Sequence, residues 1–208
     1  MKKFLLVDDH VVVRSGIKAL LSEIYDPAEV HEAADGNATM ELLKSNHYDL
    51  VILDIQMPDT DTLGLMKFIH EKHQEVKVLI FSMGSESIFA KRFLKAGAMG
   101  FVSKDSPLSD ITNAINAILN NKKYMSDELM DRLAQDSIYG RPVNPFDKLS
   151  PKEFEIASLL LSGKTVTDIS KSLNIHTSTV GTHKARLLEK LEVGNVLELS
   201  ELAKAYLK

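Results

Sequence analysis

The sequence predicts an α/β protein with a five-stranded, doubly wound parallel sheet, joined to a small all-α domain. Three observations predict this class. The first ~120 residues alternate short apolar runs with amphipathic helical runs, whereas the last ~60 show helical patterns only. The chain has 208 residues, which is enough for two domains of ordinary size. Near-continuous apolar strands are typical of a parallel sheet covered by helices on both faces.

Five apolar runs are the predicted strands of this sheet. They cover residues 4–7, 30–33, 50–53, 76–81 and 100–102. Each run is followed by apolar residues at helical spacing, which predicts a helix after every strand. These predicted helices cover residues 13–24, 36–43, 63–70, 88–94 and 111–119. A doubly wound sheet places its site outside the carboxyl ends of its strands.

The C-terminal part is predicted to be helical and to follow a linker. We expect a first domain over 1–121, a linker over 122–147 and a second domain over 148–208. Within the linker, residues 126–133 favour a short helix, and Gly140, Pro142, Asn144 and Pro145 break regular structure. Four helices are predicted beyond it, over 150–162, 165–173, 177–191 and 195–206. In the first of them, Ser150 is suited to cap the helix and Glu153 to close a capping box.

The composition excludes several classes of protein. There is no Cys, which excludes disulfides, Cys-ligated zinc and thiol catalysis and fits a reducing cytosol. No apolar run approaches the roughly 18 residues that a membrane-spanning helix needs. The N-terminal apolar stretch stops at Asp8, after four residues, whereas the core of a signal peptide has about 7–15. We therefore expect a cytoplasmic protein with no membrane partner.

The charge of the chain is unevenly distributed. The net charge is −4, which argues against a general binder of polyanions. Residues 148–208 hold nine basic and seven acidic residues, a net of +2, and the remainder holds 16 and 22, a net of −6. If the C-terminal domain binds DNA, one face must concentrate its positive charge, or two copies must act together.

Polar residues follow the predicted strands where those strands end. Asp8 and Asp9 follow the first strand, Asp54 the third, Ser82 the fourth and Lys104 the fifth. A parallel sheet brings these ends to one edge, and clustered carboxylates stay ionised only beside a cation. Mg²⁺ is the expected cation, because it takes oxygen ligands and can bind carboxylate and phosphate oxygens at the same time.

Such a site suits phosphoryl transfer. Asp54 is placed to attack a phosphoryl group and form an acyl phosphate. Mg²⁺ and the Lys104 ammonium would neutralise the phosphoryl oxygens, and Ser82 could donate a hydrogen bond to one of them. Taken singly, each Asp is also an ordinary turn residue. The adjacent His10 is more simply a residue of a helix start than a ligand, since Mg²⁺ prefers oxygen.

These residues resemble the receiver domains of two-component response regulators, over essentially all of residues 2–120. Such domains have a flavodoxin-like fold. The resemblance implies that Asp54 is the phosphoacceptor. It also implies that Mg²⁺ is held by Asp8, Asp9, Asp54 and the main-chain carbonyl of Gln56.

The resemblance extends to the residues of the phosphate-dependent switch. Lys104 and Ser82 resemble the pair that senses phosphate, and Phe101 resembles the aromatic residue that rotates in the switch. By itself, Phe101 is equally well a core side chain. Two departures stand out: Pro107 lies further beyond Lys104 than is common, and Thr62 replaces a frequent Gly. Neither departure removes a chemical group from the site.

The predicted C-terminal helices match a helix-turn-helix pattern, with two short helices joined by a tight turn at residues 174–176. The helix after this turn has a polar side suited to base edges and phosphates in a major groove. The expected DNA contacts are Ser178, Thr179, Thr182, His183, Lys184 and Arg186. From composition alone, a helical interaction domain with a solvated charged face is an equal alternative.

A resemblance favours DNA binding over that alternative. The segment over residues 147–207 resembles the output domain of the NarL/FixJ (LuxR-type) regulators. The residues that carry it are Leu149 to Glu153, Gly163, Ile169 to Leu173, Ile175, Thr179, Val180, His183 and Lys190 to Val193. Gly181 departs from the family, which usually has Lys there, so the DNA sequence recognised cannot be transferred from relatives.

The predicted function is therefore a phosphorylation-dependent, DNA-binding transcription regulator. Its expected partners are a sensor histidine kinase, double-stranded DNA and, once phosphorylated, a second copy of the chain. We expect no enzymatic activity beyond Mg²⁺-dependent self-phosphorylation and slow autodephosphorylation. Two alternatives stay open: a phosphatase or phosphotransferase of similar topology, and a regulator that acts only through protein partners.

Overall fold

The computed structural model describes residues 1–57, 60–83, 86–131, 134, 144–173 and 175–206. It divides into two compact units, Met1–Asp127 and Glu128–Lys208. Each unit is described by itself. Gly140, Pro142 and Asn174, which the sequence places in the linker and in the turn, lie outside the described residues.

The first unit contains a five-stranded sheet in which all neighbouring strands are parallel. The strands lie in the order β2-β1-β3-β4-β5. They are β1 (Lys2–Val7), β2 (Ala28–Ala33), β3 (Leu50–Leu53), β4 (Lys77–Ser82) and β5 (Gly100–Ser103). This confirms the predicted fold class, with β2 beginning two residues earlier than the apolar run that predicts it.

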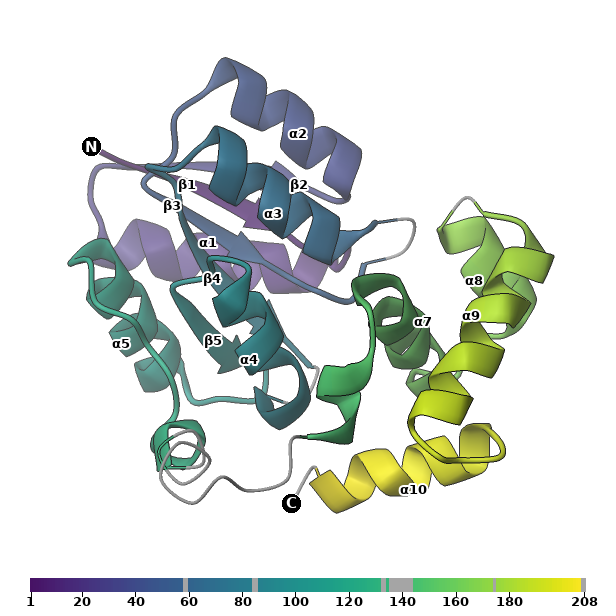
Figure 1. Cartoon of the computed structure of the whole chain (residues 1–208). Coiled ribbons are helices and arrows are strands. Elements are labelled where there is room, and N and C mark those ends of the chain that lie inside the picture. The colour runs from purple at the N-terminus through teal and green to yellow at the C-terminus, as the bar shows by residue number, and fades with distance from the viewer. Residues whose placement is uncertain (58–59, 84–85, 132–133, 135–143, 174, 207–208) are drawn as a thin grey trace. The chain divides into compact units, whose positions relative to one another are not determined.

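Five helices cover the two faces of the sheet. They are α1 (Val11–Ile24), α2 (Gly36–Ser45), α3 (Thr62–Lys72), α4 (Glu86–Lys95) and α5 (Leu108–Leu119). Helices α1 and α5 share one core cluster with the strands, which includes Ile17 and Leu21 of α1, Ile111 and Ile115 of α5, and Phe4 of β1. Figure 1 shows α2, α3 and α4 on the other face of the sheet. The carboxyl ends of the strands therefore lie between two helical layers.

Threonine and aspartate side chains fix the segment that follows β3. The buried Thr62 hydroxyl donates to the Ile55 carbonyl at 3.1 Å, and the Thr60 hydroxyl accepts from the Gly36 amide at 3.0 Å. Asp61 caps α3 by accepting from the amide of Gly64 at 2.8 Å. Thr62 thus anchors this segment to the chain just beyond Asp54.

In the described part of the second unit, all regular secondary structure is helical. It contains a 3₁₀ helix, η1 (Pro145–Lys148), and the helices α7 (Pro151–Leu161), α8 (Val166–Ser172), α9 (Thr177–Lys190) and α10 (Val196–Tyr206). A further short helix covers 127–131, within the segment expected to favour one. Helix η1 lies in the stretch expected to be linker, and its Phe146 is only 1% exposed, so this end of the stretch is helical and buried.

Capping and a glycine define where the helices of the second unit begin and end. Helix α7 has the capping box expected from Ser150 and Glu153, and α8 has another, formed by Thr165 and Asp168. Gly163 follows α7 with a φ of 83°, a left-handed conformation that favours Gly. Helix α8 ends at Ser172 and α9 begins at Thr177, the order and spacing that the helix-turn-helix pattern predicts.

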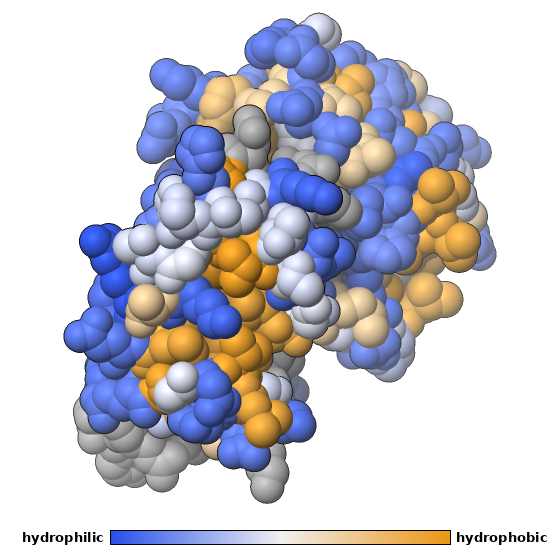
Figure 2. Space-filling model, turned by 90° about the vertical axis from the view of Figure 1, so that its right-hand side faces the viewer, coloured by the Kyte–Doolittle hydropathy of each residue, from blue (hydrophilic) through white to orange (hydrophobic). Residues whose placement is uncertain are grey.

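The described helices include none that is both long and apolar enough to cross a bilayer. Figure 2 shows hydrophilic residues over most of one face of the molecule, with hydrophobic residues gathered among them.

Candidate functional site

Four of the predicted site residues lie at the carboxyl ends of the strands. Asp8 follows β1, Asp54 follows β3, Ser82 ends β4 and Lys104 follows β5. The amide of Asp54 donates to the Val7 carbonyl at 2.8 Å, and the amide of Lys104 donates to the Ser82 carbonyl at 3.1 Å. These bonds continue the pairing of neighbouring strands and hold the four residues along one edge of the sheet.

The ammonium of Lys104 joins the two most buried carboxylates of the site. Its Nζ lies 2.6 Å from Oδ2 of Asp8 and 2.7 Å from Oδ2 of Asp54. All three side chains are nearly enclosed, with exposed fractions of 8%, 6% and 2%. Burial acts to lower the pKa of Lys104, but its bonds to Asp54 and Asp8 outweigh this effect and raise that pKa above 10.5. Lys104 is therefore a fixed positive charge between two acids.

The other oxygen of Asp54 faces the segment that follows β3. Its Oδ1 accepts a hydrogen bond from the main-chain amide of Gln56 at 3.0 Å. Gln56 is thus adjacent to the acidic site through its backbone amide, and the role of its carbonyl in holding an ion stays a prediction.

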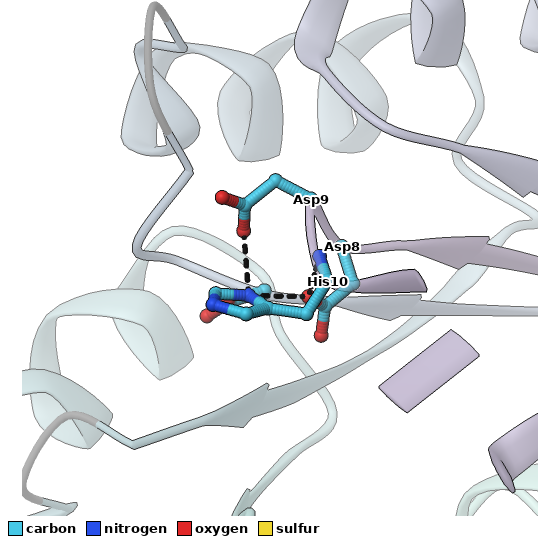
Figure 3. Close-up of side chains that lie close together, drawn as sticks. Asp8, Asp9 and His10 are labelled. Atoms are coloured by element: carbon cyan, nitrogen blue, oxygen red, sulfur yellow. Dashed lines mark hydrogen bonds and ion pairs between the residues drawn. The ribbon is translucent and has the colours of Figure 1, made fainter. Parts of the chain in front are cut away.

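Asp9 and His10 lie beside Asp8, as Figure 3 shows. One ligand atom each from Asp8, Asp9, His10 and Asp54 lies within 4.8 Å of the others. His10 precedes α1 and makes no side-chain capping bond. Its position before a helix agrees with the expectation from sequence, but its ring also turns toward the carboxylates.

The donor set fits a hard divalent cation. Three carboxylates converge here, and Asp9 Oδ1, which is shielded from solvent, lies 2.9 Å from His10 Nδ1. Carboxylate oxygens are the ligands that Mg²⁺ takes in proteins, together with water. Asp8, Asp9 and Asp54 could hold such an ion, with the Gln56 carbonyl nearby in the chain.

Ser82 and Phe101, the predicted switch residues, are both enclosed. Ser82 is fully buried and Phe101 is 1% exposed. Phe101 pairs with Ile80 in the β4–β5 ladder, two residues before the pair formed by Ser82 and Ser103. Phe101 is thus a core side chain in this structure, and its role in a switch stays a prediction.

Arg14 also contacts the site, and the sequence reasoning did not identify it. Its Nη1 donates to the main-chain carbonyl of Asp8 at 2.6 Å, and its Nε donates to Glu32 Oε2 at 3.1 Å. Both partners lie on strands or at their ends, so neither has helical spacing from Arg14. A spacing pattern therefore gives no signal for this contact.

Helix α9 presents only part of the predicted DNA-contacting set to solvent. Its buried stripe contains Val180 and Leu187. The side chains on the exposed side are Ser178, Thr179, Thr182 and Arg186. His183 and Lys184 lie three and four residues after Val180 and are half-buried at the border of the stripe.

Two of these polar side chains are hydrogen-bonded to the helix backbone or shielded from solvent. The Thr182 hydroxyl donates to the Ser178 carbonyl at 3.0 Å. His183 Nδ1 is buried without a hydrogen-bond partner among the described residues. Among the predicted contacts, Arg186 is the exposed cation, and it lies on the same side of the helix as Ser178 and Thr182.

Both units match known protein families. Residues 4–116 match the response regulator receiver domain, and residues 147–203 match the bacterial regulatory proteins of the luxR family. The chain is 32% identical to the response regulator GacA of Pseudomonas syringae pv. syringae (strain B728a), over 98% of this chain and 95% of that protein.

Solved structures of RcsB resemble the whole chain. RcsB of Salmonella enterica serovar Typhimurium, bound to promoter rprA with the phosphomimetic BeF₃⁻, has a TM-score of 0.73 at 27% identity and covers 99% of this chain and 98% of its own. Two RcsB dimers bound to two parallel DNAs give a TM-score of 0.61 at 26% identity, with 98% of each chain covered. The chain therefore belongs to the two-component response regulators, with a receiver domain and a luxR-family helix-turn-helix domain of the NarL/FixJ type.

Proposed function

We propose that Asp54 accepts a phosphoryl group from a sensor histidine kinase, and that this step controls binding of the second domain to DNA. The observation that carries the proposal is the arrangement of Asp54, Asp8 and Lys104, in which one ammonium lies within 2.7 Å of both carboxylates. The site and a luxR-family domain belong to one chain, so a chemical change at the first can regulate the second.

The chemistry of this step follows from the partners of Asp54. A carboxylate oxygen of Asp54 attacks phosphorus, and the bond from phosphorus to the imidazole nitrogen of the donor breaks as the acyl phosphate forms. The Lys104 ammonium is placed to neutralise a phosphoryl oxygen, since its Nζ lies 2.7 Å from Asp54. Bound Mg²⁺ would supply further positive charge to the same oxygens. Asp8 and Asp9 are the side chains that would hold it with Asp54.

No second acid capable of hydrolysing a substrate follows Asp54, where the chain continues Ile-Gln-Met-Pro. We therefore propose that the chain turns over no external phosphoester and that its reactions are limited to its own phosphorylation and dephosphorylation. A DNA ligand and a kinase partner also imply a cytoplasmic location.

The exposed face of α9 is the proposed DNA-contacting surface. Arg186 is its exposed cation, with Ser178, Thr179 and Thr182 beside it. A net charge of +2 over residues 148–208 gives few phosphate contacts per copy. A second copy doubles these contacts, and RcsB dimers bound to DNA support this arrangement. We propose that the phosphorylated chain binds DNA as a homodimer.

The test is the DNA affinity of the wild-type chain and of Asp54→Asn, each with Mg²⁺ and with or without a small phosphodonor. Genomic fragments selected by the wild-type chain serve as the DNA. We expect the phosphodonor to increase the affinity of the wild-type chain and to leave that of Asp54→Asn unchanged. Equal affinities under all conditions would refute the coupling, and binding without sequence preference would favour a regulator that acts through protein partners.

A further inference from the structure

Arg14 of α1 holds the main chain between the two acids that follow β1. Its Nη1 donates to the Asp8 carbonyl at 2.6 Å, and only 12% of its side chain is exposed. In the described part of the chain, no other group donates to that carbonyl. A peptide unit is planar, so this one bond sets the direction in which the chain enters Asp9.

The two acids differ in how their carboxylates are held. The Asp8 carboxylate accepts from the His10 amide at 2.8 Å and lies 2.6 Å from the Lys104 ammonium, so it is fixed from two sides. The Asp9 carboxylate has the His10 ring as its ion-pair partner, and 63% of that side chain is exposed. The direction of the Asp9 carboxylate therefore depends mainly on how the main chain reaches it.

Glu32 of β2 holds the guanidinium of Arg14 in place. Its Oε2 accepts from Arg14 Nε at 3.1 Å, and its Oε1 accepts from Lys18 Nζ at 2.8 Å. Its bonds to Lys18 and then to Arg14 lower the pKa of the Glu32 carboxyl group, although burial acts to raise it. The planar guanidinium can present Nε to Glu32 and Nη1 to the carbonyl at the same time. Glu32 thus fixes the guanidinium and offsets its charge beside a site that would bind a cation.

We infer that Arg14 is a positioning residue for the cation of the acidic site. It acts through the peptide between Asp8 and Asp9, which directs the Asp9 carboxylate toward the ion, and Glu32 holds it in that role. This inference rests on the proposed function, in which these two acids and Asp54 hold Mg²⁺. Loss of a group that orients the ligands of a metal typically lowers the affinity for the metal about 10–100-fold.

The first experiment measures binding of Mg²⁺ alone to the full-length chain by calorimetry. We expect Arg14→Met to bind Mg²⁺ at least about tenfold more weakly than the wild-type chain. The sign of this change is informative, because removing a nearby positive charge would by itself strengthen the binding of a cation. A role in folding alone would leave the affinity of the folded chain unchanged. Met keeps an unbranched stem, and thermal unfolding with a chelator present checks that the variant is folded.

Three further variants assign the effect to the bond with the carbonyl. Lys18→Met is the matched control: it removes the other cation from Glu32, its side chain is 49% exposed, and it should bind Mg²⁺ like the wild-type chain. Glu32→Gln should weaken Mg²⁺ binding in the wild-type background and should weaken it no further in Arg14→Met, because it acts through Arg14. Asp8→Asn gives the affinity of any sites elsewhere.

The second experiment follows phosphorylation by a small phosphodonor over a range of Mg²⁺ concentrations. In Arg14→Met the half-saturating Mg²⁺ concentration should rise by the factor that calorimetry gives. The rate at saturating Mg²⁺ should stay within about threefold of that of the wild-type chain, because Asp54 and Lys104 are unchanged.

The outcomes separate this inference from the proposed function. Unchanged or tighter Mg²⁺ binding in Arg14→Met, or an equal loss in Lys18→Met, would overturn the inference and leave phosphorylation of Asp54 intact. A wild-type chain that binds Mg²⁺ but accepts no phosphoryl group would overturn the proposed function, and the effect of Arg14 on Mg²⁺ affinity would stand. A wild-type chain that binds no Mg²⁺ would overturn both.

Discussion

The Nζ atom of Lys104 lies 2.7 Å from Oδ2 of Asp54, although the two residues are 50 positions apart in the chain. The same ammonium lies 2.6 Å from Asp8. Two nearly buried carboxylates thus share one counter-charge. This arrangement makes the stability of the first unit depend on Lys104.

Replacing Lys104 with Met should destabilise the first unit. The substitution removes the positive charge and leaves the carboxylates of Asp8 and Asp54 facing each other at 6% and 2% exposure. Loss of one partner from a buried ion pair typically costs about 3–5 kcal/mol. We expect a loss of about 3 kcal/mol in the free energy of unfolding, measured by urea denaturation with a chelator present. Mg²⁺ should restore part of that loss.

Lys18→Met provides the matched control for this prediction. Lys18 Nζ lies 2.8 Å from Glu32, but the lysine side chain is 49% exposed. Exposed pairs contribute about 0–1 kcal/mol, so this variant should change stability little and should not respond to Mg²⁺. Equal losses in the two variants would show that burial of the Lys104 charge has no special consequence.

The second unit should lose stability in acid because of Glu153. Burial acts to raise the pKa of this carboxyl group, but its bonds to Lys190 and Ser150 outweigh burial and lower the pKa below its ordinary value of 4.5. A folded-state pKa below the unfolded one gives stability that is present above 4.5 and is lost as pH falls through the folded value.

Glu153→Gln should therefore reduce the stability of the second unit at neutral pH and flatten its acid dependence. Hydrogen bonds to charged groups contribute about 1.5–3 kcal/mol, so we expect a loss of about 2 kcal/mol near neutrality. Thermal unfolding as a function of pH measures both effects. Glu189→Gln, an exposed carboxylate beside Lys190 in the chain, is the control and should keep the wild-type pH dependence. The account of Glu153 fails if both variants keep that dependence.

Gly181→Lys should strengthen DNA binding. Gly181 lies within α9, and a side chain added there would meet nothing within 4 Å. Each new phosphate contact makes the slope of log affinity against log salt steeper by about 0.9. We expect that change for Gly181→Lys, measured by titrating labelled DNA at several salt concentrations.

Gly16→Lys is the matched control, because it adds the same charge to α1, where a side chain also meets nothing within 4 Å. It should leave the salt dependence of DNA binding unchanged. Equal slopes for the two variants would place the DNA contact away from this part of α9.

The sequence predicts the fold well because its strands are continuous apolar runs. The segment Leu50 to Leu53 is uncharged and fully buried, so periodicity alone identifies it as a central strand. The ends of β2 are less predictable, since Glu29 and His31 interrupt its apolar character. Strand ends also place Asp8, Asp54 and Lys104 near one another once the sheet is known to be parallel.

Contacts that depend on side-chain direction could not be predicted in this way. Arg14 reaches the carbonyl of Asp8 across the gap between a helix and a strand, which no local pattern encodes. The sequence places His183 on the polar side of α9, but in the structure it lies at the border of the buried stripe. His10 reads as a helix-start residue, and only the structure shows its ring between two carboxylates.

The most direct measurement is the intact mass of the wild-type chain and of Asp54→Asn after incubation with a small phosphodonor and Mg²⁺. The wild-type chain should gain the mass of one phosphoryl group, and the substituted chain should gain none. A phosphoryl group carried equally by both chains, or by neither while Mg²⁺ is bound, would contradict the assignment of Asp54.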